Sequence, residues 1–161
     1  MKILKFISPL ILFFPVLLIQ FIFVPMIAIG SIIPNLIIIL LTYYALKFGQ
    51  ITGTILGSIY GLVFDIISGG ILGSAMFAGT LSGFIAGYFY NENKTDFNLK
   101  TIFFVFIVFI SATFNSFFYL LLTNTEIELS ASYLIIENGI LPGIYTSAIS
   151  IPFMIFNKNL K

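Results

Sequence analysis

The sequence predicts an all-α integral membrane protein with six transmembrane helices, and three observations lead to this prediction. Of the 161 residues, 60% are hydrophobic and 8% are charged, whereas a soluble domain carries roughly 25% charged residues. The apolar residues fall into six runs, and a helix needs about 20 apolar residues to cross a bilayer. All seven basic residues are lysines that fall on one side of the resulting topology. The runs occupy nearly the whole length, so we expect one transmembrane domain over residues 1–161.

The first apolar run covers residues 6–24 and follows two lysines. It is longer than the roughly 7–15 apolar residues at the centre of a signal peptide. Ala28-Ile29-Gly30 nevertheless resembles a small-residue cleavage site. We expect the run to be retained as a helix. Pro9 and Pro15 should kink it or loosen its first turns, because proline cannot donate a backbone hydrogen bond.

The later runs are joined by short connections. Pro34 fits a first helical position, where a missing N–H needs no partner. Lys47-Phe48-Gly49 is so short a link that the helices on either side should be antiparallel neighbours. Ser68-Gly69-Gly70 forms the next turn, and the two later connections, Asn91–Lys100 and Thr123–Ser132, are polar. The runs lack the alternating ten-residue segments of a β-barrel. The predicted helices cover residues 6–24, 33–46, 50–67, 71–90, 101–122 and 133–156.

The lysines predict the orientation. With the N-terminus in the cytoplasm, all seven lie on the cytoplasmic side, as the positive-inside rule requires. Four of the six acids lie at or near the other side. We therefore expect a multi-pass protein with both termini in the cytoplasm. The net charge of +1 offers no basic surface for nucleic acid. The lysines are Lys2, Lys5, Lys47, Lys94, Lys100, Lys158 and Lys161, and the outer acids are Asp65, Glu126, Glu128 and Glu137.

Two ladders of small residues mark the third and fourth predicted helices. Small residues one turn apart let two helix backbones approach closely in lipid. The simplest interpretation is that the two ladders pack on each other. The alternative is that one ladder faces a partner protein. The glycines are Gly53, Gly57 and Gly61 on one helix, and Gly79, Gly83 and Gly87 on the next.

Asp65 is the only acid that lies inside a predicted span beyond its first turn. A charged side chain at mid-bilayer costs about 2.5–3.5 kcal/mol, so it normally has a partner. We expect Asp65 to accept hydrogen bonds from amides around Gly69–Gly73, where the start of the next helix favours negative charge. A contact with a ligand or partner is the alternative. Asn115 should bond to a neighbouring helix, and Glu137 suits the first turn of the last helix.

Pro142-Gly143 interrupts the last predicted helix. Proline removes one hydrogen bond and displaces the carbonyl four residues earlier, here that of Asn138. A freed carbonyl within a membrane must pack on protein or line a cavity. The start of this helix is therefore either a plain kink or a candidate functional surface, with Asn35 among the nearby polar residues.

Catalytic chemistry is not indicated. The sequence has no Cys, His or Trp. This excludes thiolate nucleophiles, zinc sites built on nitrogen or sulfur ligands, and histidine acid–base catalysis. No nucleotide motif is present either. We predict a protein that is not an enzyme and uses neither a cofactor nor a metal.

Four segments follow one another in a recognisable order: Pro34-Asn35-Leu36, Gly57 to Asp65, Ser68-Gly69-Gly70-Ile71-Leu72-Gly73 and Gly83 to Tyr88. With these segments the chain resembles the rod shape-determining protein MreD family. The resemblance covers nearly the whole chain. Asn35 stands where the family commonly has an acid, so a charge is lost there.

The resemblance implies a scaffold of the bacterial cell-wall elongation machinery in the inner membrane. It implies binding to MreC and, directly or indirectly, to MreB, the wall polymerase and the transpeptidase. It also implies a fold similar to the six-helix S-components of energy-coupling-factor transporters. A second hypothesis follows, a substrate-binding subunit of a vitamin transporter with a polar pocket near Asn35, Asp65 and Glu137. A third, an ion-coupled transporter using Asp65, is disfavoured because transporters place such residues near the midplane.

Overall fold

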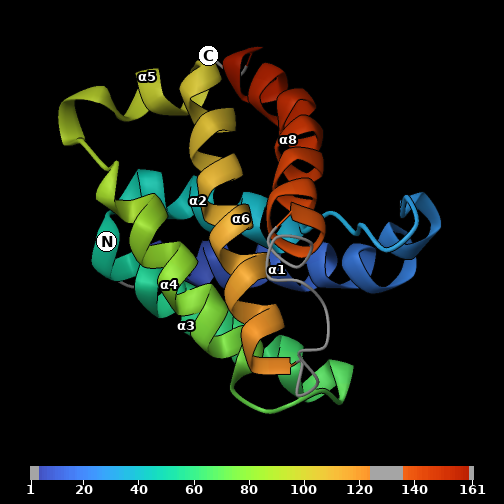
Figure 1. Cartoon of the computed structure of the whole chain (residues 1–161). Helices are drawn as coiled ribbons and strands as arrows, with labels where there is room; N and C mark the ends of the chain where they lie inside the picture. The colour runs from blue at the N-terminus through green and yellow to red at the C-terminus, as the bar shows by residue number, and fades with distance from the viewer. Residues whose placement is uncertain (1–3, 124–135, 160–161) are drawn as a thin grey trace.

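The computed structural model describes residues 4–123 and 136–159, and the regular structure in these ranges is helical (Figure 1). An isolated bridge between Ile29 and Ile32 is the one extended pairing there. The all-α prediction is confirmed. The elements are α1 (Leu4–Ile22), η1 (Val24–Ile27), α2 (Leu36–Phe48), α3 (Gln50–Ser68), α4 (Ser74–Tyr88), η2 (Glu92–Lys94), α5 (Thr95–Lys100), α6 (Ile102–Thr123), η3 (Ile136–Ile140) and α8 (Leu141–Asn159).

Each predicted run contains a helix, but several ends differ. Pro34 lies outside α2, which contradicts its expected place in the first turn. Asn35 is instead the N-cap, because its side chain accepts a hydrogen bond from the amide of Ile38. The predicted loop Asn91–Lys100 contains η2 and α5, since Asn91 caps η2 in the same way. Glu126, Glu128 and the predicted start at residue 133 lie outside the described residues.

The surface of the described chain is apolar, as expected for contact with lipid. Large hydrophobic side chains are exposed along α1, α3, α4, α6 and α8, whereas several polar side chains are fully buried. Three helical segments have the length and composition to cross a membrane: Gln50–Ser68, Ile102–Thr123 and Ile136–Phe156. Ile7–Ile22 and Leu36–Phe48 are apolar but shorter.

The α3 and α4 helices lie side by side (Figure 1), and the two glycine ladders face each other. A Cβ atom on Gly57 would overlap the carbonyl of Gly79, and one on Gly61 would overlap the carbonyl of Ala75. The glycines therefore set the separation of the two helices. Their partners lie within the chain, which favours the internal-packing interpretation over a ladder free for a partner. The remaining ladder positions, Gly53, Gly83 and Gly87, also approach backbone of the facing helix.

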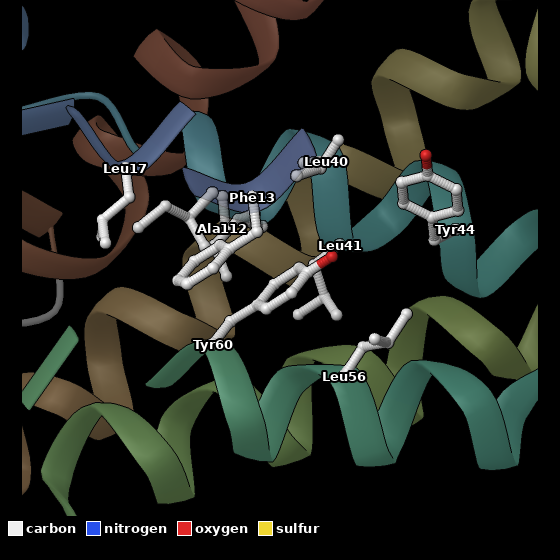
Figure 2. Packing of buried hydrophobic residues seen from close by; sticks show 10 residues of the cluster. Phe13, Leu17, Leu40, Leu41, Tyr44, Leu56, Tyr60 and Ala112 are labelled. Atoms are coloured by element: carbon white, nitrogen blue, oxygen red, sulfur yellow. The ribbon is translucent and has the colours of Figure 1, made fainter. Parts of the chain in front are cut away.

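One core cluster joins α1, α2, α3 and α6 (Figure 2). Phe13 of α1 stacks on Tyr60 of α3 with ring centroids 4.2 Å apart. The Tyr60 hydroxyl also donates to the Pro9 carbonyl at 2.8 Å. A ring stack and a hydrogen bond thus fix α1 across α3. A second cluster, which includes Leu46, Leu99 and Phe104, lies between α2, α5 and α6.

The two ends of the helix bundle differ in charge. The α2–α3 turn, the end of α4 and α5 meet at one end, where Gln50 Nε2 donates to the Phe84 carbonyl and Asn98 Nδ2 to the Phe89 carbonyl. Lys47 and Lys94 are exposed there. The α3–α4 turn and the start of η3 form the opposite end. Asp65 lies at that end and Glu137 begins the last helical segment there.

Candidate functional site

Asp65 holds the start of α4. Its side chain is 1% exposed. Oδ2 accepts from the amides of Gly73 at 2.9 Å and Met76 at 3.1 Å. Oδ1 accepts from the amide of Ala75 at 3.0 Å, and the Ser74 hydroxyl lies 3.2 Å from it. The carboxylate therefore satisfies amides that would otherwise be unpaired at a helix start. The expected bonds near the α3–α4 turn are present, shifted slightly along the chain toward α4.

Local sequence explains why the cap comes from a distance. Gly73 occupies the N-cap position of α4 with a φ of 97°, a left-handed conformation that favours glycine. Glycine has no side chain to accept from the first amides, and no such bond forms. Asp65, almost at the end of α3, supplies the missing acceptor. Its negative charge also complements the positive end of the α4 dipole.

Asn35 holds the start of α2, and its polar contacts extend to two distant helices. Oδ1 accepts from the Ile38 amide at 3.3 Å. Nδ2 donates to Oδ1 of Asn115 in α6 at 3.3 Å. The backbone amide of Asn35 donates to the hydroxyl of Thr146 in α8 at 3.0 Å. One residue thus joins α2, α6 and α8.

Gln20 of α1 completes this junction. Its Oε1 accepts from the Leu36 amide at 2.8 Å, and its Nε2 donates to the Pro34 carbonyl at 2.9 Å. We call the set Gln20, Asn35, Asn115 and Thr146 the α2 junction. The sequence analysis missed Gln20 and Thr146. Gln20 could have been identified from the sequence, because it is the one amide side chain in the first apolar run.

A cavity of about 380 Å³ opens beside the α2 junction. Its walls combine neutral polar side chains with apolar ones, and no charged residue in the described part of the chain lines it. Asp65 and Glu137 are absent from the lining, in contrast to the polar pocket expected near both. The polar lining residues are Gln20, Ser31, Asn35, Tyr60, Asn115, Ser116, Tyr119, Thr123 and Asn138.

The segment around Pro142 forms one side of this cavity. Pro142 is buried, lines the cavity and is the second residue of α8. The π-helical turn η3 precedes it, and such turns occur often at functional sites. A Cβ atom on Gly143 would overlap the hydroxyl of Thr113, so α8 approaches α6 closely here. The interruption predicted at Pro142-Gly143 is thus a change of helix type at a tight contact.

Glu137 lies beside the cavity lining. Its Oε1 accepts from the Ser31 hydroxyl at 3.0 Å, which links η3 to the segment before α2. Its Oε2 is buried and has no hydrogen-bond partner among the described residues. Asn138, the next residue, lines the cavity. The acid and the cavity are neighbours, but the acid does not face into it.

The geometry agrees with the motif order found in the sequence, since the Asn35 side chain caps the start of α2 and the Asp65 side chain bonds the start of α4. A family model described as rod shape-determining protein MreD matches residues 1–159. The chain belongs to the MreD family. Membership in the MreD family implies a cell-shape-determining membrane protein, and the family is structural rather than a known enzyme family. No curated protein and no solved structure matches the chain.

Proposed function

We propose that this MreD-family chain is a non-enzymatic scaffold of the cell-wall elongation machinery in the bacterial inner membrane, needed for rod shape. In this proposal it binds MreC and, directly or indirectly, MreB, the wall polymerase and the transpeptidase. The observation that carries the proposal is the family match, which extends over residues 1–159 and so includes every described helix.

The role of Asp65 supports a scaffold over an ion-coupled transporter. Both carboxylate oxygens accept hydrogen bonds from the backbone of α4, and the side chain is buried. A proton-carrying acid must exchange its partners during transport, whereas these partners belong to the helix that Asp65 holds in place. These contacts therefore support a structural role for Asp65.

We further propose six crossings with both termini in the cytoplasm. The α3 helix has 19 residues, which is about 28 Å and close to the roughly 30 Å of a bilayer core. Lys47 and Lys94 lie at one end of the bundle, opposite to Asp65. Positive residues stay on the cytoplasmic side during insertion, so this end would face the cytoplasm.

The orientation can be tested by single-cysteine labelling, because the sequence contains no cysteine. Leu72, in the α3–α4 turn, is 70% exposed, and Asn93 in η2 is exposed at the other end. In intact spheroplasts, a membrane-impermeant maleimide should label Leu72→Cys and leave Asn93→Cys unlabelled. Asn93→Cys should react after the membrane is permeabilised. Labelling of Asn93→Cys alone in intact spheroplasts would reverse the topology.

The scaffold role can be tested by photocrosslinking in the source bacterium. A photoreactive amino acid at Leu72 or at Ile136, which is 52% exposed, should crosslink MreC or a wall-synthesis enzyme. The matched control is the same amino acid at exposed Phe97 in α5, at the opposite end. Depletion of the chain should turn rods into spheres. Normal rods after deletion, together with no wall-synthesis protein in the crosslinked material, would refute the proposed role.

A further inference from the structure

We propose that the cavity beside the α2 junction binds an uncharged organic molecule, one that presents a carbonyl-type acceptor to Asn115 and an apolar body to the surrounding helices. This ligand site goes beyond the scaffold role, since a scaffold needs no ligand.

The backbone of α2 fixes which group Asn115 offers to the cavity. The Ile38 amide is a donor, so the Asn35 atom that meets it must be the carbonyl oxygen. The Asn35 Nδ2 then points at Asn115 and must meet an oxygen, Oδ1. This bond fixes the orientation of the Asn115 amide, so that Asn115 Nδ2 points away from Asn35. The chain of hydrogen bonds therefore aims a donor, not an acceptor, at the remaining space.

That donor is unsatisfied within the described chain. Asn115 is only 9% exposed, lines the cavity, and its Nδ2 donates to no described residue. The nitrogen is also absent from the fully enclosed unpaired atoms, so it retains accessible surface. Ser116 and Tyr119 line the same cavity, and their hydroxyls likewise bond to no described residue. A polar group on a cavity wall needs a hydrogen-bond partner, which an acceptor on a ligand would supply.

The composition of the walls defines the class of ligand. No charged side chain of the described residues lines the cavity, and an unpaired charge in such a site would be strongly penalised. Apolar side chains such as Leu41, Phe64 and Leu120 cover much of the wall. The volume of about 380 Å³ lies in the range of small-molecule sites, roughly 300–1,000 Å³. These features fit a neutral molecule with one hydrogen-bonding group on an apolar body.

The length of α2 places the cavity inside the membrane. The helix has 13 residues, about 20 Å, so its start lies roughly 10 Å short of the outer limit of a 30 Å core. Non-helical backbone precedes Asn35 at this depth. Such backbone is tolerated only against protein or beside a polar cavity. A ligand can therefore enter from the outer side without crossing the full bilayer.

The test uses three probes that share one ring and differ in charge: benzamide, benzoate and benzylammonium. Binding to the purified full chain in lipid nanodiscs is followed by saturation-transfer magnetic resonance. We expect saturable binding of benzamide, with both charged probes at least tenfold weaker. Asn115→Leu, which replaces the amide with an apolar side chain of similar size, should weaken benzamide by about tenfold, or about 1.4 kcal/mol. Ser116→Leu, which narrows the cavity, should also weaken it.

The matched control is Phe114→Leu, next to Asn115 but 42% exposed on the outside of α6. It should change benzamide binding by less than twofold. Non-saturable benzamide uptake, equal binding of the charged probes, or full binding to both cavity variants would overturn the proposal. The scaffold role is tested separately, because Asn115→Leu should still recover MreC. Loss of ligand binding and loss of MreC are thus distinguishable.

Discussion

The starts of α4 and α2 solve the same problem with different chemistry. At the start of α4, one carboxylate accepts from the amides of Gly73, Ala75 and Met76 and is sealed from its surroundings. At the start of α2, two neutral amides, Asn35 and Gln20, divide the task. Their bonding continues into α6 through Asn115. The Asp65 carboxylate is buried and lies outside the cavity lining. Asn35 and Gln20 both line the cavity.

The difference shows that a polar residue in a membrane helix can have two distinct roles. The charged group, the Asp65 carboxylate, bonds to amides at the start of α4, and these bonds fix α4 to α3. Neutral groups are used where some hydrogen-bonding capacity remains open, since a neutral group is less costly to leave beside an apolar wall than a charge. We therefore assign structure to Asp65 and recognition to the α2 junction.

The largest loss of stability should come from removing the Asp65 carboxylate at the start of α4. Asp65→Ala leaves three α4 amides without their charged acceptor, and bonds to charged groups contribute about 1.5–3 kcal/mol each. Because bonds within one network do not add, we expect a loss of about 3–5 kcal/mol in the free energy of unfolding, measured by denaturant titration in detergent micelles. Asp65→Asn keeps one acceptor oxygen, so its free energy of unfolding should lie between those of the parent and of Asp65→Ala. Parent-like unfolding of Asp65→Ala would remove the contrast between the two helix starts.

The α3–α4 contact should be the next most sensitive. Gly57→Ala places a Cβ atom against the Gly79 carbonyl, and overpacking of this kind costs about 1–3 kcal/mol. The control is Gly70→Ala, where the nearest atom to a new Cβ is the Ser68 hydroxyl oxygen at 3.5 Å. The melting temperature of the control should stay close to that of the parent. Equal shifts for the two variants would show that the glycine ladder does not set the helix separation.

A smaller loss of stability is expected at the start of α2. Asn35→Ala removes one helix cap, which contributes about 1 kcal/mol, while Gln20 still accepts from the Leu36 amide. Thermal unfolding should therefore show a shift well below that of Asp65→Ala. The bond to Asn115 is lost at the same time, so benzamide binding should weaken as the Asn115 amide becomes free to rotate. A larger destabilisation than at Asp65 would invert the comparison.

The smallest stability change is expected for Asn35→Asp, which restores the acid that the family commonly carries. The new carboxylate can still cap α2, and a negative charge there contributes about 0.3–1 kcal/mol. Its second oxygen would face Asn115 Oδ1, now 3.3 Å from Asn35 Nδ2, so the Asn115 amide should turn over. Stability should change by less than about 1 kcal/mol while benzamide binding falls. Unchanged benzamide affinity would argue against the fixed orientation of Asn115.

The sequence was sufficient for the all-α class and for the α3–α4 unit, because both depend on local patterns. It was not sufficient for the short η2 and α5, which lie in a predicted loop. Apolar runs locate the helices, and glycines four residues apart identify α3 and α4 as close neighbours. Asp65 could be placed correctly because its partners follow within a few residues. Pro34 was placed two positions too deep, since nothing local shows that Asn35 caps α2 and that Leu36 is its first residue.

The α2 junction could not be predicted in the same way. Gln20 bonds to Leu36 across a sequence separation of 16 residues. Asn115 bonds to Asn35 across a separation of 80 residues. Such contacts depend on how α1 crosses α3 through the Phe13–Tyr60 stack. The cavity depends on packing at every wall, so no single motif encodes it. Sequence reasoning found Asn35 and Asn115 separately but had no signal that they touch.

The short α4 has a consequence for the surrounding lipid. In the proposed arrangement its 15 residues span about 22 Å, against roughly 30 Å of hydrocarbon. Phe77, Phe84 and Tyr88 project from it and are exposed. A helix shorter than the hydrocarbon core is accommodated by local thinning of the bilayer or by oligomerisation, at a cost of fractions of a kcal/mol per Å. A neighbouring protein with a similarly short helix would relieve that strain, so bilayer thickness itself could influence which proteins gather beside α4.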